Sequence, residues 1–296
     1  MKYLFIILLL LSSFWLKAQL PKPASGTIVR HASFPSVYVQ SRHIDVWLPE
    51  NYSSSRKYAV LYMQDGQMLF DSSITWNRQE WGVDETLSRL MKEGKIRDCI
   101  VVGIWNTGRT RHAEYFPQKA IQWLPEADKN TIMPLLLDTP RADLYLKFLV
   151  TELKPWIDSA YATYTGPGHT FIAGSSMGAL ISLYALISYP RVFSGAACLS
   201  THWPGGFRAN EAIPMAFNRL IREELPRSGE HRLYFDYGTA TLDSLYKPYQ
   251  QEIDIAVKDR GYTDKNWITK EFPGEDHSEK AWSKRLFIPL EFLLRK

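Results

Sequence analysis

Features that would narrow the function at once are scarce in this sequence. Only two cysteines occur in 296 residues, which excludes a small scaffold held together by disulfides. A chain this long can bury a full core without a structural metal. No two of the seven histidines have the H-x-x-x-H spacing of a helical metal site. We therefore expect a protein that uses no metal and no organic cofactor.

Runs of basic residues are also missing. The formal net charge is +4, and leaving out Lys2 and Lys17 of the N-terminal segment lowers it to +2, with 33 basic and 31 acidic residues. Without a basic run or a strongly positive balance, nucleic acid is not an expected partner.

No apolar run in the sequence is long enough to span a bilayer comfortably. Lys2 precedes the apolar residues 3–16, which fall short of the roughly 20 that a spanning helix needs, and Ala18 offers a small residue at a cleavage point. The pattern is typical of a cleaved signal peptide, which we predict over residues 1–18. An uncleaved anchor is the alternative. The mature protein would then be secreted or periplasmic, with no stable membrane insertion.

Residues 19–296 alternate short apolar runs with longer helical patterns. This alternation predicts an α/β fold, a mostly parallel sheet with helices on both faces, in one domain. Residues 117–140 are the least regular stretch, and long connections in compact domains are usually lids or binding loops, so we predict a lid insertion there. The strand-like runs are 26–34, 36–50, 58–66, 99–105, 170–174, 195–200, 232–238 and 267–274.

The sequence GSSMG, residues 174–178, follows one apolar strand and opens an apolar helix. The pattern is G-x-S-x-G, and its spacing selects Ser176 rather than Ser175. A serine on such a strand-to-helix turn has a strained backbone that exposes its hydroxyl, while a side chain at Gly174 or Gly178 would collide across the turn. The context predicts that Ser176 is a nucleophile.

A serine nucleophile needs a base, and in this architecture the acid and then the histidine follow it in the chain. Only His202, His231 and His277 follow Ser176. His231 begins its strand at the wrong end, and His202 directly follows the strand of residues 195–200. His277 lies just past the carboxyl end of the last strand, where ligands bind in parallel sheets. We predict that His277 is the base.

The catalytic acid should lie in the loop after the strand of residues 232–238, which points to Asp243. Asp236 inside that strand is the alternative. The oxyanion hole needs two backbone N–H groups. We expect one from Met177, directly after the nucleophile, and one from Gln67, where Gly66 allows close backbone approach.

With these residues placed, the chain resembles the putative esterase family of α/β-hydrolases, which includes enterochelin esterases, feruloyl and acetylxylan esterases, S-formylglutathione hydrolases and mycolyltransferases. The resemblance implies an α/β-hydrolase fold and supports Ser176, Asp243 and His277 as a triad. The family's usual strand order puts the strands of Cys99 and Cys198 three places apart, or roughly 14 Å, beyond disulfide reach. The segments that carry the resemblance are 46–71, 101–117, 171–200, 234–244 and 274–282.

The resemblance implies a serine-dependent carboxylic ester hydrolase acting through an acyl-enzyme, on a siderophore-type or carbohydrate-linked ester carrying feruloyl or acetyl groups. An acyltransferase with the same triad, and an inactive binding protein on this scaffold, are the alternatives. The predicted partner is a small-molecule or glycan-linked ester.

Aromatic and basic residues near the site suggest which side chains contact the substrate. Five tryptophans fall near the carboxyl edge or in the predicted lid, and about two of them should line a pocket. We predict Trp105, Trp203 and Arg111 as pocket residues. Arg109 and Arg111 would attract an anionic substrate, and pairing of Arg111 with Glu114 is the alternative. The tryptophans are Trp76, Trp81, Trp105, Trp123 and Trp203.

Overall fold

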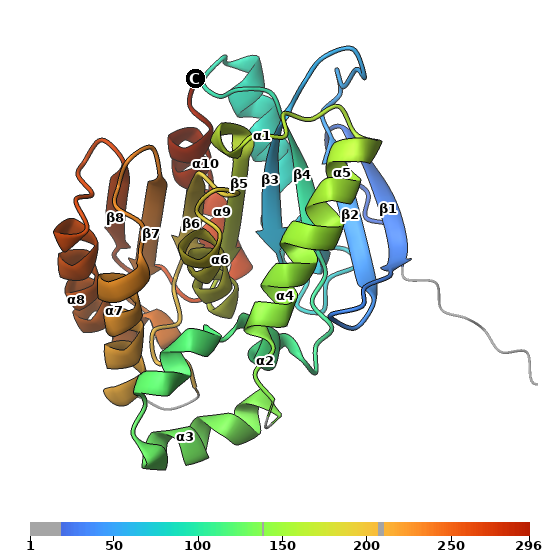
Figure 1. Cartoon of the computed structure of the whole chain (residues 1–296). Coiled ribbons are helices and arrows are strands. Elements are labelled where there is room, and N and C mark those ends of the chain that lie inside the picture. The colour runs from blue at the N-terminus through green and yellow to red at the C-terminus, as the bar shows by residue number, and fades with distance from the viewer. Residues whose placement is uncertain (1–18, 138, 207–209) are drawn as a thin grey trace, which may run out of the picture.

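The computed structural model describes residues 19–137, 139–206 and 210–296. Eight strands form one sheet in the order β1-β2-β4-β3-β5-β6-β7-β8 (Figure 1). β1 and β2 are antiparallel, and β3 to β8 run parallel to one another. This confirms the predicted mostly parallel sheet. The strands are β1 (Thr27–Phe34), β2 (Arg42–Leu48), β3 (Ala59–Gln64), β4 (Cys99–Ile104), β5 (Thr170–Ser175), β6 (Gly195–Leu199), β7 (Arg232–Gly238) and β8 (Trp267–Phe272).

Helices cover both faces of the sheet (Figure 1). In that view α4 to α8 lie in front of the strands, and α1, α9 and α10 lie behind them. The helices are α1 (Val83–Lys92), α2 (Arg111–Tyr115), α3 (Glu126–Ile132), α4 (Ala142–Phe148), α5 (Lys154–Ala160), α6 (Met177–Ser188), α7 (Ala212–Glu224), α8 (Tyr246–Asp259), α9 (Glu279–Arg285) and α10 (Phe287–Leu294).

The strand side chains alternate between two hydrophobic cores, as the two-residue period of a strand requires. Along β3, Val60 and Tyr62 pack with α4 to α8, whereas Leu61 and Met63 pack with α1, α9 and α10. Because β3 is buried on both faces, its sequence is an unbroken apolar run rather than an alternating one. The carboxyl ends of β3 and β5 to β8 meet at one edge of the sheet, which is where the predicted site residues lie.

The two cysteines lie on strands separated by two others. Cys99 begins β4 and Cys198 is in β6, and β3 and β5 run between them. Both thiols are buried and free. This confirms the expectation that the two residues do not form a disulfide.

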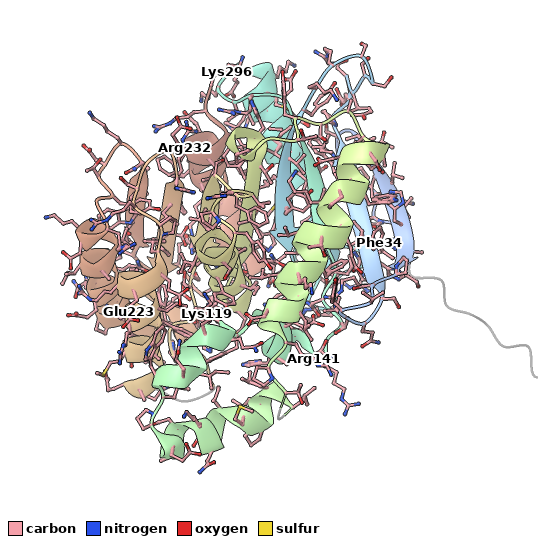
Figure 2. The ribbon with its side chains drawn as sticks, viewed as in Figure 1. Phe34, Lys119, Arg141, Glu223, Arg232 and Lys296 are labelled. Carbon is pink, nitrogen blue, oxygen red and sulfur yellow. The ribbon has the colours of Figure 1, made fainter. Side chains whose placement is uncertain are left out.

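Residues 117–140 are not the irregular loop that the sequence suggested. They contain the short helices η2 (Gln118–Trp123), α3 and η3 (Met133–Leu136). Lys119 of η2 forms an ion pair with Glu224 of α7, and Figure 2 labels Lys119 on this segment. The segment is thus a helical layer packed on the fold. The predicted signal peptide, residues 1–18, lies outside the described residues, and no helix among those described is long and apolar enough to cross a membrane.

Candidate active site

Ser176 occupies the turn between β5 and α6. Its backbone has φ 56° and ψ −123°, in the region that residues with a side chain rarely adopt. The strain is held by hydrogen bonds on both sides, from the Ser176 N–H to the Leu199 carbonyl (3.0 Å) and from the His202 N–H to the Ser176 carbonyl (3.3 Å). The turn thereby holds a part-exposed serine at the carboxyl edge of the sheet.

Glycine is required on both sides of this turn. A Cβ at Gly174 would lie 2.5 Å from the carbonyl oxygen of Gly178, and one at Gly178 would lie 3.1 Å from Cβ of Gln64. Gly66 has the same role in the loop after β3, where a Cβ would lie 2.5 Å from the carbonyl carbon of Gly103. The predicted collision across the turn is therefore present at Gly174, whereas Gly178 is in tight contact with the neighbouring strand β3.

Ser176 and His277 line the same cavity, which has a volume of about 580 Å³. The segments after β3 and β4 contribute Asp65, Gln67 and Arg111 to its lining, and the loop after β8 and helix α9 contribute His277 and Trp282. Of these residues, the sequence analysis named Gln67, Arg111 and His277.

His277 is held by the loop after β7. Its Nδ1 lies 2.5 Å from Oδ1 of Asp243, and its backbone N–H donates to Oγ1 of Thr241 (3.0 Å). The Asp243 side chain is fully buried, whereas that of His277 is 16% exposed. An imidazole held at Nδ1 presents its other nitrogen, Nε2, for proton transfer.

Asp243 accepts two further hydrogen bonds at Oδ2. Ser200 Oγ lies 2.5 Å away and the Gly238 N–H lies 2.6 Å away. Burial would raise the pKa of Asp243, but the hydrogen bonds from His277, Ser200 and Gly238 and the charge of His277 outweigh it and lower that pKa. Asp243 is consequently an ionised, fully hydrogen-bonded carboxylate.

Asp236, the alternative acid, does not contact His277. It is fully buried and pairs with Arg285, with 2.9 Å from Nη2 to Oδ1 and 3.1 Å from Nε to Oδ2. Tyr234 and the Ser200 N–H also donate to it. Burial raises the pKa of Asp236 despite the opposing charge of Arg285. The structure thus brings Asp243, and not Asp236, to the histidine.

Met177 and Gln67 each lie at the beginning of a helix. Met177 is the first residue of α6, and Gln67 is in η1 (Gly66–Met68). The first N–H groups of a helix have no carbonyl partner within the helix, so these positions suit N–H groups that bind an oxyanion. Asp65, which precedes η1, has the left-handed φ of 56°.

Arg111 secures this loop through a partner that the sequence analysis did not foresee. Its Nε and Nη2 lie 2.8 and 2.7 Å from the two carboxylate oxygens of Asp65, and Asn106 Nδ2 donates to Oδ1 of Asp65 at 2.7 Å. The alternative that Arg111 pairs with Glu114 is wrong, because both oxygens of Glu114 lie 2.8 Å from the buried guanidinium of Arg42. Arg111 does line the cavity, as predicted.

The predicted tryptophans were wrong in identity but right in number. Trp203 is fully buried and donates to Gln250, and the Trp105 indole donates to Asp45 on β2, so neither lines this cavity. Of the five candidates, Trp76 and Trp81 line it instead. Position at the sheet edge alone does not reveal which way a side chain points.

Several residues of the site were not anticipated at all. Trp282 lines the cavity, and its ring lies 5.1 Å from that of His277 at a steep angle. Ser200 and Arg285 contact the carboxylates behind the histidine. The one available signal for Trp282 was its place shortly after His277, at the start of a helix. No described residue of 117–140 lines the cavity, and a lid formed by that segment stays a prediction.

A family model confirms the resemblance read from the sequence. The model described as "Putative esterase" matches residues 36–290. The chain belongs to this family. The esterase family and the eight-stranded sheet together identify an α/β-hydrolase fold and support a serine esterase.

Relatives of this esterase chain include two uncharacterised proteins of Bacillus subtilis (strain 168). YjcH is 28% identical over 172 residues, which are 58% of this chain and 60% of YjcH. YbbA is 22% identical over 264 residues, which are 86% of this chain and 94% of YbbA. The chain thus spans well under two thirds of the length of the first of these relatives.

Solved esterase structures share the fold at low sequence identity. The enterobactin esterase of Shigella flexneri superposes with a TM-score of 0.66 and 15% identity, over 92% of this chain and 60% of that one. A ferulic acid esterase from Anaeromyces mucronatus, in complex with ferulic acid, gives 0.63 and 20% over 90% of each chain. An IroE-like serine hydrolase from Shewanella oneidensis gives 0.65 and 20%, over 90% of this chain and 79% of that one.

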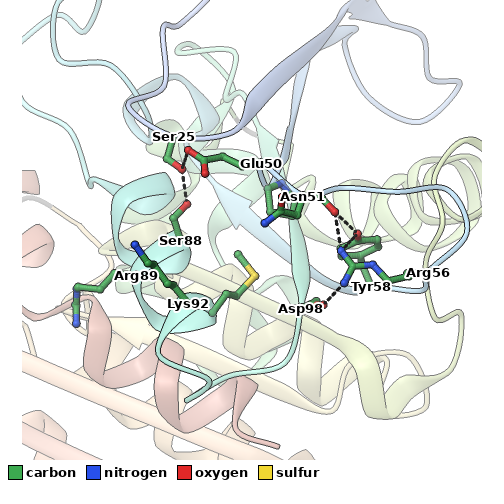
Figure 3. A pocket seen from close by; sticks show the side chains of 11 residues that line it. Ser25, Glu50, Asn51, Arg56, Tyr58, Ser88, Arg89, Lys92 and Asp98 are labelled. Carbon is green, nitrogen blue, oxygen red and sulfur yellow. Dashed lines mark hydrogen bonds and ion pairs between the residues drawn. The ribbon is translucent and has the colours of Figure 1, made fainter.

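A second cavity, of about 650 Å³, shares no lining residue with the cavity that contains Ser176 (Figure 3). Its polar groups largely satisfy one another: Ser25 bonds to Ser88 and Glu50, and Arg56 pairs with Asp98. Among the described residues, no three His, Cys, Asp or Glu side chains are grouped so that they could hold a metal ion. We therefore build the chemistry on the cavity that contains Ser176.

Proposed function

We propose that this chain is a serine-dependent carboxylic ester hydrolase that acts through an acyl-enzyme. The observation that carries the proposal is a serine on a strained turn that shares a cavity with a histidine held by a buried carboxylate. A nucleophile, a base and an orienting acid in this relation are the parts that acyl transfer requires.

In the proposed first step, Ser176 Oγ attacks the ester carbonyl carbon and its proton passes to Nε2 of His277. The Nδ1–H of His277 donates to Asp243, which fixes the required tautomer and stabilises the imidazolium that forms. The N–H groups of Met177 and Gln67 donate hydrogen bonds to the carbonyl oxygen and stabilise the negative charge that develops on it. When the tetrahedral intermediate collapses, the alcohol leaves with the proton from His277.

In the second step, water attacks the acyl-Ser176 ester and His277 takes its proton. Collapse of this intermediate releases the carboxylic acid and returns the proton to Ser176 Oγ. The same groups therefore serve both halves of the reaction.

The lining of the cavity supports an ester that carries many hydroxyl or amide groups. Gln67, Asn77, Gln79 and Asn106 line it, and amide side chains both donate and accept hydrogen bonds. Trp76, which is 84% exposed, offers a flat apolar surface at the same cavity. We propose a siderophore-type ester or a feruloyl or acetyl ester of a carbohydrate, a choice also motivated by the enterobactin and ferulic acid esterases that share the fold.

Hydrolysis of p-nitrophenyl acetate and methyl ferulate by Ser176→Ala and His277→Ala tests the mechanism. Loss of either residue should lower kcat by about 10⁴-fold to 10⁶-fold. The matched control is His231→Ala, which removes a histidine at the amino end of β7 and should leave kcat unchanged. A fluorophosphonate probe should label the wild type and the control but not Ser176→Ala. If Ser176→Ala keeps wild-type activity, the proposed mechanism is wrong.

A further inference from the structure

Ser200 lies directly behind the proposed catalytic acid. It follows the last residue of β6, is fully buried and has the left-handed φ of 42°. Its Oγ contacts three groups: Oδ2 of Asp243 at 2.5 Å, Nε1 of Trp282 at 2.9 Å and Nη2 of Arg285 at 2.9 Å. No sequence motif pointed to this residue, and the proposed mechanism gives it no role.

The direction of each of these hydrogen bonds follows from the chemistry of the groups. The indole N–H of Trp282 and the guanidinium of Arg285 can only donate, so both lone pairs of the Ser200 hydroxyl are occupied. Its single proton then has one acceptor left among its contacts, which is Asp243. A hydroxyl that accepts from a guanidinium is polarised and becomes a stronger donor.

The arginine of this group is itself fixed. Arg285 is paired with the buried Asp236 through two of its nitrogens, and Asp236 also accepts from Tyr234 and from the Ser200 N–H. Ser200 is thus held by its own backbone and by Arg285, and both are anchored on the same carboxylate. The Asp236–Arg285 pair places a charged donor where it cannot move away from the serine.

We propose that Ser200 is a positioning residue for catalysis, whose hydroxyl donates its hydrogen bond to Asp243 and thereby holds that carboxylate ionised and turned toward His277. This inference rests on the proposed function, because it assigns Asp243 the part of the catalytic acid. The Asp236–Arg285 pair and Trp282 fix the direction of the donated bond. Trp282 also lines the cavity and contacts the ring of His277, so the group reaches the substrate side of the site.

Two substitutions at Ser200 separate the hydroxyl from the backbone. Ser200→Ala and Ser200→Gly both remove the donor, but only glycine adopts a positive φ without strain. Ser194→Ala is the matched control, because Ser194 is a part-buried serine at the opposite end of β6. Rates are counted per active site by titration with a fluorophosphonate, so that a variant that folds poorly is still measured through its folded fraction.

Both Ser200 variants should lose about 10-fold to 100-fold in kcat per active site, as is usual when a partner of a functional residue is removed. The acid limb of kcat/KM should also move to higher pH. Without the Ser200 proton the charge of Asp243 is less compensated, so the imidazolium is favoured and the base is protonated at a higher pH. A residue that served only the fold would change the number of active sites and leave this limb in place.

The inference is overturned if both Ser200 variants match Ser194→Ala in kcat per site and in the position of the acid limb. If Ser200→Gly is normal and Ser200→Ala is impaired, the backbone and not the hydroxyl matters, and the inference is again wrong. Failure of the proposed function is a separate result, because it requires that Ser176→Ala remain active.

Discussion

Two aspartates of the candidate site, Asp65 and Asp243, each accept three hydrogen bonds, yet their donors differ. Asp65 lines the cavity next to Gln67 and accepts from Asn106 and twice from Arg111. Asp243 is buried behind His277 and accepts from His277, Ser200 and the Gly238 N–H. The number of bonds is the same, but the charge of the donors differs.

This difference in donor charge indicates which carboxylate is suited to stabilise an imidazolium. The negative charge of Asp65 is already paired with the permanently charged guanidinium of Arg111. Asp65 is therefore suited to hold the loop after β3 in place. Asp236 is neutralised in the same way by Arg285. Asp243 has only neutral donors and a histidine, so its charge becomes paired when the imidazolium forms. Burial strengthens that pairing, since the Asp243 side chain is fully buried and those of Asp65 and Arg111 are 12% and 27% exposed.

Among the three carboxylates, the largest predicted effect on kcat is that of Asp243→Asn. The amide would keep the size of the side chain but would favour the wrong tautomer of His277, and we expect a loss of about 10⁴-fold in kcat. The measurement is the steady-state rate on p-nitrophenyl acetate, with circular dichroism to verify folding.

Asp236→Asn should instead affect the stability of the fold more than catalysis. It leaves the buried charge of Arg285 without its partner, and we expect the free energy of unfolding to fall by about 3–5 kcal/mol. Its kcat per folded molecule should fall less than that of Asp243→Asn. If the order of the two kcat values is inverted, the assignment of the acid is wrong.

The second prediction concerns stability at low pH and the buried residue His202. His202 is 4% exposed, and burial together with the charge of His277 lowers the pKa of His202 to about 3. The unfolded chain takes up this proton near pH 6.5 and the folded chain does not. The stability gained from the neutral form is therefore complete above about pH 6.5 and is lost as the pH falls toward 3, by about 1.4 kcal/mol per pH unit.

Denaturant unfolding of wild type and His202→Gln at several pH values between 6.5 and 4 measures this effect. Because glutamine cannot titrate, the free energy of unfolding of the variant should depend less steeply on pH, by about 1.4 kcal/mol per pH unit. This difference in slope does not depend on the absolute stability of the variant. Equal slopes in the two proteins would mean that His202 is protonated in the folded state.

The third prediction concerns the loop after β3, which carries the proposed oxyanion donor Gln67. Arg111→Gln removes a partly exposed ion pair that holds Asp65, without removing either proposed oxyanion donor. We expect kcat to fall about tenfold, which is less than the loss of about 10²–10³ that follows removal of one donor itself. The pH dependence of kcat/KM should keep its shape. A loss as large as that of Asp243→Asn would contradict the view that the Arg111–Asp65 pair only holds the loop after β3 in place.

Much of the architecture could be predicted from the sequence because it depends on local pattern. The apolar runs indicated the parallel strands. The pattern G-x-S-x-G between a strand and a helix predicted the turn at Ser176. Chain order then selected His277 and Asp243, which the structure places 2.5 Å apart. In each of these cases the position of a residue relative to a strand end was enough.

What could not be predicted depends on contacts between distant segments. The sequence offered Glu114 as an alternative partner for Arg111, but its partner, Asp65, lies 46 positions away. Ser200 meets Trp282 and Arg285 across 82 and 85 positions. Trp203 lies at the expected edge, but its ring turns into the core, and no periodicity in a loop specifies that direction.

The smallest predicted effect concerns Trp76 at the mouth of the cavity. Because 84% of its surface is exposed, Trp76→Ala should change the free energy of unfolding by no more than about 0.5 kcal/mol. Trp81 also lines the cavity, but it is buried against Trp282, so Trp81→Ala should cost about 3–5 kcal/mol. If Trp76 contacts the acyl group, its loss should raise KM several-fold for methyl ferulate and leave KM for p-nitrophenyl acetate unchanged. A change confined to p-nitrophenyl acetate would instead place Trp76 on the alcohol side, because the aromatic ring of that ester belongs to its alcohol.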